Sequence, residues 1–297
     1  MQTHVFPPVG GIEAGGTKMV CSIGYPDGTI LKRESFPTEM PETTIPKLIQ
    51  FFVRNPVTSL CLASFGPIQL NKNAKDYGNI TSTPKLAWTD IPILPIIRDA
   101  LEIPVVFETD VDAAAYGELM IGAGKGLSNI VYITIGTGVG GGVVSEGRIV
   151  HGLLHPEIGH MLVRAHPYDG APDGFCPYHK GCLEGVASGP AILKRTGIPA
   201  QNLPQDHPVW NLVAYYIAQC AVNLIVTVSP ERIILGGGVM KQTHLFAMIR
   251  RNVTDILNGY IRSDVIVNNI DSYIVATALG DDSAAAGCLI LAGESPL

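Results

Sequence analysis

The sequence predicts an α/β protein made of two lobes of similar plan. Apolar, strand-like segments alternate with segments of helical periodicity along the whole chain, which is typical of this class. Two glycine-rich turns, at 10–18 and 135–150, each occur beside a strand, a tight turn and a second strand, and they lie about 120 residues apart. Because the hairpin recurs, we expect two lobes, with a boundary near residue 115.

The other elements follow from local composition and periodicity. A third glycine-rich turn, at 232–240, comes after an apolar β-rich run and before an expected helix. Pro230 ends a long apolar helix that precedes this run. The expected helices lie at 44–55, 88–101, 206–229, 244–261 and 281–293, and a further strand lies at 59–68. The segment 104–124 is expected to form a strand, a loop and a helix in that order.

The composition is that of a globular protein without a nucleic-acid or membrane partner. Hydrophobic residues make up 46% of the 297 positions and charged residues only 15%, which excludes a disordered chain. The net charge of −6 argues against a basic patch that would bind DNA or RNA. No run of about 18 apolar residues predicts a membrane span, and the first residues lack the pattern of a secretory signal. We therefore expect a cytoplasmic protein.

The cysteines fall into two groups. Cys21, Cys61, Cys220 and Cys288 have apolar neighbours, which predicts small buried side chains rather than a disulfide framework. The segment CPYHKGC at 176–182 instead places two thiols and an imidazole in one loop. A fourth ligand from the nearby segment 155–160 would complete a tetrahedral zinc site.

The three glycine turns are candidates for binding a phosphate chain. Glycine lets backbone N–H groups approach a phosphate closely, and the first two turns add Thr17, Lys18 and Thr137. Either of these turns alone is equally well explained as a tight hairpin. Taken together, the three turns predict a phosphate clamp shared between two lobes.

Six segments, in this order, resemble the ROK family of sugar kinases over nearly the whole chain. They are GIEAGGTK (11–18), ETDVDAAAYGE (108–118), ITIGTGVGGG (133–142), HPEIGH (155–160), CPYHKGCLEG (176–185) and IILGGGV (233–239). The resemblance implies a two-lobed α/β fold of the actin and hexokinase type (ribonuclease H-like) with a central cleft between the lobes. It assigns 1–115, completed by a C-terminal helix at about 281–297, to a smaller N-terminal lobe and 116–280 to a larger C-terminal lobe with the zinc-binding loop.

The resemblance also implies an activity. Members of the family transfer phosphate from ATP to a sugar hydroxyl with Mg²⁺ on the phosphates. Segments 77–88 and 155–160 resemble the fructokinase branch, which implies that D-fructose becomes fructose 6-phosphate. We also expect a homodimer. The residues implied for ATP are Gly15, Gly16, Thr17, Lys18, Gly136, Thr137, Gly138, Pro190, Gly236, Gly237, Gly238, Val239, Met240, Lys241 and Gln242.

Asp110 is the candidate catalytic base. It follows an apolar strand and precedes a helix, a position that commonly faces a ligand in α/β folds. Phosphoryl transfer to a hydroxyl requires a base that orients it and removes its proton, and Asp110 matches the family's catalytic aspartate. The family usually has Asn where this chain has Thr109 and Asp112, and we interpret Asp112 as the helix N-cap. Glu13 stands where most members of the family have Asp, and a contact between Glu13 and Mg²⁺ stays open.

The resemblance completes the zinc site and names the sugar ligands. It implies a structural zinc on His160, Cys176, His179 and Cys182, although many relatives use one His and three Cys. For His155 we prefer a capping or sugar-facing role, and for His166 a solvated loop position. A first-turn helix carboxylate is the competing interpretation of Glu184. The residues implied for the sugar are Thr81, Asp110, Glu157, His160 and Glu184.

Three other functions compete with a fructokinase. A kinase for glucose, mannose or an N-acetyl hexosamine is the first alternative, and a non-catalytic sugar sensor is the second. The sugar-responsive repressors of the family carry a DNA-binding segment before the first glycine turn, whereas only about ten residues precede it here. We therefore expect a kinase.

Overall fold

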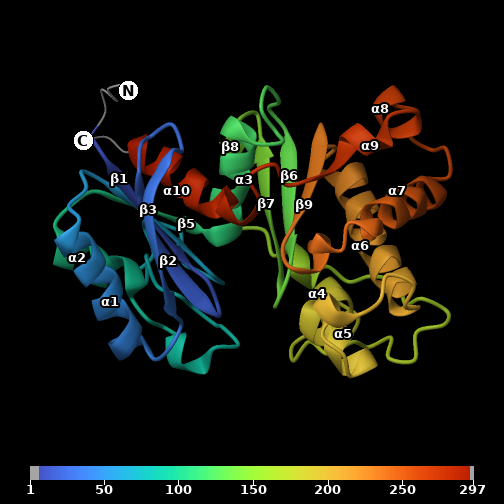
Figure 1. Cartoon of the computed structure of the whole chain (residues 1–297), viewed down its shortest axis with the longest axis horizontal. Coiled ribbons are helices and arrows are strands. Elements are labelled where there is room, and N and C mark those ends of the chain that lie inside the picture. Colours follow the sequence, from blue (N-terminus) through green and yellow to red (C-terminus); the bar gives the residue numbers. More distant parts are fainter. Residues whose placement is uncertain (1–6, 295–297) are drawn as a thin grey trace. The chain divides into compact units, whose positions relative to one another are not determined.

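Each of two units is built on a five-stranded sheet (Figure 1). The computed structural model describes residues 7–294. The first unit contains the described residues up to Gly122, the segment Ile149–Pro156 and the residues from Asp281 onward. The second unit contains Ala123–Arg148 and Glu157–Gly280.

The sheet of the first unit brings three strand ends to one edge. Its order is β3-β2-β1-β4-β5, with β1–β2–β3 antiparallel and β1, β4 and β5 parallel. Ala14 pairs with Ser64 and Ser64 with Thr109, so the residues that follow β1 and β5 emerge at the same edge. The strands are β1 (Val9–Ala14), β2 (Lys18–Gly24), β3 (Ile30–Pro37), β4 (Leu60–Ser64) and β5 (Val105–Thr109).

Helices cover both faces of this sheet. A Cβ at Gly10 would meet Phe52 of α1 (Pro41–Arg54), whereas a Cβ at Gly11 would meet Cys288 of α10 (Ser283–Gly293). Because successive residues of a strand point to opposite faces, α1 and α10 lie on opposite sides. The first of these faces also carries α2 (Ile93–Leu101), whose apolar side chains join one core with those of α1 and the strands.

The helices α3 (Asp110–Ile121) and α10 cross with their backbones in close contact. A Cβ at Gly287 would lie 1.8 Å from the carbonyl oxygen of Ala113, and one at Gly117 would lie 2.4 Å from that of Ser283. Only glycine fits at these two positions, because a Cβ within 3 Å of backbone forces one helix away from the other.

The second unit repeats the arrangement of strand ends. Its sheet order is β10-β9-β6-β7-β8, with β6–β7 antiparallel and β6, β9 and β10 parallel. Thr134 of β6 pairs with Gly236 of β9, so the second and third glycine turns follow neighbouring strands at one edge. The strands are β6 (Ile130–Ile135), β7 (Val139–Ser145), β8 (Arg148–Ile149), β9 (Arg232–Gly236) and β10 (Ile274–Ala276).

Helix α6 (Val209–Thr227) forms the core of the second unit and packs on α7 (His244–Leu257). By length and apolar composition, it is the one helix of residues 7–294 that could cross a membrane, yet 67% of its apolar window is buried inside the structure. This burial is typical of the core helix of a globular unit. The shorter helices are α4 (Leu183–Ala187), α5 (Gly189–Thr196), α8 (Asp264–Val267) and α9 (Ile270–Tyr273).

The α/β class, both hairpins and the long apolar helix are as the sequence predicts. The four cysteines expected in apolar surroundings are fully buried. The loop expected between β5 and its helix does not form, because Thr109 caps α3 and the helix starts at Asp110.

Candidate active site and metal centre

The first glycine turn joins β1 to β2 at the edge of the first sheet. The N–H of Gly15 donates to the carbonyl oxygen of Lys18 at 3.0 Å, and Thr38 Oγ1 donates to the carbonyl of Gly15 at 2.7 Å. A Cβ at Gly15 would lie 2.8 Å from that Lys18 oxygen, so the tight turn itself requires this glycine. Gly16 has more room, and the side chains of Thr17 and Lys18 are exposed, which leaves them free to contact a ligand.

Asp110 is the first residue of α3 and lies at the same edge of the first sheet as this turn. Its Oδ1 accepts the N–H of Val111 at 2.9 Å. Burial and, to a smaller extent, the negative charge of Asp112 raise the pKa of Asp110 to about 6, against the backbone hydrogen bond from Val111. A carboxylate with this pKa is ionised at neutral pH and can still take up a proton, as a general base must.

The interpretation of Asp112 as the helix N-cap is wrong. Thr109 is the cap, because its Oγ1 accepts the N–H of Asp112 at 3.0 Å and donates to Asp112 Oδ2 at 2.7 Å. Thr109 precedes the helix and has the extended backbone of a cap residue, whereas Asp112 is already helical. Asp112 Oδ1 is buried without a hydrogen-bond partner among residues 7–294.

His151 was not predicted from the sequence as a site residue, yet it lies beside the carboxylate of Asp112. Its Nε2 lies 3.0 Å from Glu108 Oε2 and 3.6 Å from Asp112 Oδ2. The three side chains form one of two clusters of metal-ligand type in the described part of the chain. No spacing rule links position 151 to positions 108 and 112, so the contact could be found only in three dimensions.

Thr81 and His155 both support the backbone of the first unit. Thr81 Oγ1 donates to the carbonyl oxygen of Pro67 at 2.9 Å, which is a structural use of a hydroxyl implied for sugar binding. His155 is buried, and its Nε2 accepts the N–H of Ile68 at 3.1 Å. Burial lowers the pKa of His155, which keeps its ring neutral for this role.

In the second unit, the second and third glycine turns and the start of α5 come together. The N–H of Gly189 donates to the carbonyl oxygen of Gly136 at 2.8 Å. Pro190 therefore directly follows a residue that contacts the second turn. A Cβ at Gly136 would lie 3.8 Å from the N of Gly238. Gly237 has a φ of +88°, and a Cβ there would lie 2.5 Å from the carbonyl oxygen of Ile135, so the third turn requires glycine at this position.

The residues after the third turn offer a ligand mainly their backbone. The side chains of Val239 and Met240 are buried in the core, and the side-chain amide of Gln242 donates to the carbonyl oxygen of Ala200 at 3.1 Å. Thr137, between the two glycines of the second turn, is exposed.

The four residues of the expected zinc site come together in the second unit. The ligand atoms of His160, Cys176, His179 and Cys182 all lie within 4.8 Å of one another. The two Nδ1 atoms are 3.2 Å apart, and each of three nitrogen–sulfur pairs is 3.8 Å apart. A tetrahedral zinc with ordinary bond lengths needs about 3.3 Å between two nitrogens and about 3.6 Å between nitrogen and sulfur.

Backbone N–H groups point at both sulfur atoms. The N–H of Tyr178 donates to Cys176 Sγ and that of Gly185 donates to Cys182 Sγ, both at 3.4 Å. Such bonds stabilise thiolates, the form in which cysteine binds a metal. The donor set and its spacing therefore fit zinc.

Glu184 connects the metal centre with the second glycine turn. It lies in the first turn of α4, two residues after Cys182, and its Oε2 accepts the N–H of Val139 at 2.9 Å. A Cβ at Gly138 would lie 2.7 Å from the same oxygen, so the turn leaves room for this carboxylate only because residue 138 is glycine. Glu157 is exposed three residues before His160.

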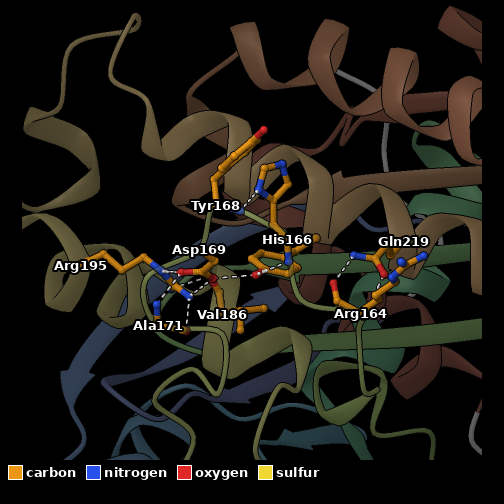
Figure 2. A network of polar contacts seen from close by, with 9 residues as sticks. Arg164, His166, Tyr168, Asp169, Ala171, Val186, Arg195 and Gln219 are labelled. Carbon is orange, nitrogen blue, oxygen red and sulfur yellow. Dashed lines mark hydrogen bonds and ion pairs between the residues drawn. The ribbon is translucent and has the colours of Figure 1, made fainter.

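A buried ion pair anchors the loop that leads into the cysteine segment (Figure 2). Arg195 of α5 donates to Asp169 through Nη2 at 2.8 Å and through Nε at 3.3 Å, and Tyr216 of α6 donates to Asp169 at 2.6 Å. The side chain of Arg195 is 8% exposed and that of Asp169 is 1% exposed. His166, expected to be a solvated loop residue, is half-buried here, because its N–H donates to the Tyr216 hydroxyl and its ring contacts Tyr215.

Comparison with known proteins agrees with this fold and these motifs. Residues 9–295 match the model of the ROK family. A fructokinase from Pediococcus pentosaceus is 46% identical over 284 residues, which cover 96% of this chain and 97% of the relative. A fructokinase from Lactococcus lactis subsp. cremoris is 43% identical, with 95% and 96% covered.

A solved structure agrees in fold. The ROK family glucokinase from Streptomyces griseus, in complex with glucose and AMPPNP, aligns with a TM-score of 0.77 at 24% identity and covers 97% of this chain and 100% of that one. The fold is therefore that of two-domain α/β sugar kinases. The chain belongs to the ROK family.

Proposed function

We propose that this protein is an ATP-dependent fructokinase that converts D-fructose to fructose 6-phosphate. The observation that carries the proposal is the full-length similarity, at 46% and 43% identity, to two proteins named fructokinase. Asp110 at the edge of the first sheet supplies the base that this reaction needs.

The base acts on the hydroxyl of the sugar. Asp110, ionised at neutral pH, accepts the proton of the C6 hydroxyl as that oxygen bonds to the γ-phosphorus of ATP. The bond between the γ-phosphorus and its bridging oxygen breaks, and ADP leaves with that oxygen. Mg²⁺, carried by the phosphates, supplies charge neutralisation.

The glycine turns of each unit are proposed as phosphate-binding segments. Gly15–Lys18 in the first unit and Gly136–Gly138 with 236–242 in the second unit follow strand ends, where backbone N–H groups are available to phosphates. The AMPPNP bound to the glucokinase of the same fold supports ATP as the donor. Thr137 and Lys18 are the exposed side chains at these turns.

The metal centre is proposed to hold a structural zinc beside the sugar ligands. Nδ1 of His160 faces the other zinc ligands, which leaves Nε2 of the same ring for a sugar hydroxyl. Glu157 and Glu184 lie within three residues of zinc ligands, so a metal would hold their backbone in place. Cytoplasmic location and a homodimer stay predictions from the sequence.

A coupled assay of ADP release tests the proposed function. Fructose, mannose, glucose and N-acetyl hexosamines are compared as acceptors, and the highest kcat/KM is expected for fructose. Another hexose with a higher kcat/KM would contradict the substrate but leave the kinase class intact. Asp110→Asn is expected to lower kcat by roughly 10²- to 10⁴-fold with sugar binding retained, and near wild-type turnover in this variant would exclude Asp110 as the base.

A further inference from the structure

The candidate base is flanked by two other acidic residues. Glu108 lies in β5 two residues before Asp110, and Asp112 lies in the first turn of α3 two residues after it. Their side chains are 12% and 1% exposed. Water therefore screens the charges of these two carboxylates poorly, and Asp112 in particular lies beside the base without solvent.

Only part of the charge on Asp112 is satisfied locally. Oδ2 accepts the hydroxyl of Thr109, and the backbone N–H of Asp112 is taken by the same hydroxyl. Oδ1 is buried and has no hydrogen-bond partner among the described residues. A buried carboxylate in this state needs a nearby positive charge or must take up a proton.

His151 is the cationic group that reaches both carboxylates. Its Nε2 lies within ion-pair distance of both, 3.0 Å from Glu108 Oε2 and 3.6 Å from Asp112 Oδ2. It comes from Ile149–Pro156, a segment that belongs to the first unit although the residues before and after it belong to the second. Its side chain is 32% exposed, so the ring can exchange protons with solvent.

We propose that His151 is a positioning residue of the kinase reaction: as an imidazolium it bridges Glu108 and Asp112, and so it keeps Asp110 ionised at neutral pH. The inference rests on the proposed function, since it assigns Asp110 the role of base. His151 acts through the two neighbouring carboxylates.

The charges around these groups give the direction of the effect. His151 faces Glu108 and Asp112, and also His155 on its own segment. The neighbouring carboxylates of Asp112 and Glu108 raise the pKa of His151 to about 10, although burial acts in the opposite direction. The imidazolium is therefore present throughout the neutral range.

The pKa of Asp110 responds to the same charges. Burial raises it to about 6, and the negative charge of Asp112 acts in the same direction. Glu13 of β1 also faces Asp110, and the pKa of Glu13 is raised to about 7, first by burial and then by the charge of Asp110. The positive charges of Lys18 and Arg33 lower the pKa of Glu13, and the negative charge of Asp281 raises it. Loss of the His151 charge would leave Asp112 uncompensated and would raise the pKa of Asp110 further.

The test is the pH profile of fructose phosphorylation in four proteins. His151→Gln is expected to move the acid limb of kcat/KM upward by roughly one pH unit, so kcat/KM at pH 7 falls to about half of its plateau and is recovered in alkali. Asp112→Asn alone should move the limb downward, because it removes the charge that raises the pKa of Asp110. The double variant should lie near wild type. A misfolded active site would not be rescued by alkali or by a second substitution.

Asp99→Asn is the matched control, because it removes an exposed carboxylate from α2. Asp99→Asn should leave the acid limb of kcat/KM unchanged. The KM for fructose and for ATP measured on the alkaline plateau should stay within about twofold of wild type in His151→Gln. An acid limb that is unchanged in His151→Gln would overturn the inference.

A second readout does not depend on activity. Histidine ¹⁵N NMR should show His151 titrating near its raised pKa of about 10 in the wild type and near about 6.5 when Glu108→Gln and Asp112→Asn are combined. A wild-type His151 that titrates near 6.5 would overturn the inference. So would metal analysis in which His151→Gln loses one equivalent that the wild type holds, because the cluster would then be a cation site.

Failure of the proposed kinase function can be distinguished from failure of the proposed role of His151. If the wild-type protein phosphorylated no hexose, the proposed function would fail and the role of His151 would fail with it, whatever the NMR titration showed. If the wild type were active and the acid limb did not respond to His151→Gln, only the role of His151 would fail.

Discussion

Replacing Arg195 by Met removes the cation of a buried ion pair and leaves a chain of similar length. The perturbation is severe because the Asp169 side chain is 1% exposed and, among residues 7–294, keeps only the Tyr216 hydroxyl and the N–H of Ala171 as partners. The carbonyl oxygens of Val186 and Ala171 each lose a donor as well. Breaking a buried pair by removing one partner costs about 3–5 kcal/mol, and we expect the free energy of unfolding of the second unit to fall by that amount.

The two tryptophans allow this unit to be observed alone. Trp88 lies in the first unit and Trp210 in the second, both buried, and the sequence contains no other tryptophan. In a Trp88→Phe background, the fluorescence of Trp210 during urea denaturation reports the second unit. Arg195→Met should lower its midpoint, and adding Asp169→Asn should restore more than half of the loss, because no uncompensated charge then remains.

The dependence on pH has a definite sign. Although burial acts to raise it, the hydrogen bonds from Arg195 and Tyr216 hold the pKa of Asp169 below its usual value. The stability that this carboxylate contributes is complete above its unfolded pKa of about 3.9 and is lost as the pH falls through the lower, folded value. A loss below about 1 kcal/mol at neutral pH, or a double variant as unstable as Arg195→Met, would refute the reasoning.

Four further predictions concern the site and the first unit. Cys176→Ser should abolish stoichiometric zinc in metal analysis and raise the KM for fructose more than that for ATP, and an unchanged KM would separate the metal from the sugar site. Thr137→Ala should weaken ATP binding more than fructose binding in calorimetry, and the reverse order would contradict the nucleotide assignment. In the wild type, kcat/KM should be constant well above the Asp110 pKa of about 6 and fall about tenfold per unit below it, whereas a flat acid profile would exclude this base. Gly287→Val should destabilise the first unit by about 3 kcal/mol, reported by Trp88 fluorescence, because its Cβ overlaps the carbonyl of Ala113; a normal midpoint would show that the helices can separate freely.

Local sequence patterns were sufficient for most elements of the fold. Glycine turns beside apolar runs identified both hairpins, and the unbroken apolar run before Pro230 identified α6, because these signals arise from neighbouring residues. The start of α3 was harder to predict, since Thr109 and Asp112 can both cap a helix. The extended backbone at Thr109 decides between them, and it is fixed by pairing with β4.

The candidate site was predicted only where residues belong to a known pattern. The four candidate zinc ligands and Asp110 match family motifs, and the distances among the candidate ligands fit a metal centre. His151 carries no local signal, because its partners lie 43 and 39 positions away and are brought to it by the return of Ile149–Pro156 to the first unit. Contacts made by such a return depend on the tertiary fold and not on spacing.

The close crossing of α3 and α10 has a consequence for synthesis on the ribosome. The first unit needs α10 to cover the face of its sheet at Gly11, yet α10 follows the whole second unit in the chain. Every strand of the second sheet therefore leaves the exit tunnel before α10 does, and that unit can fold first. During this interval the nascent first unit exposes an apolar sheet face and the small-residue side of α3, which is the surface on which a chaperone would act.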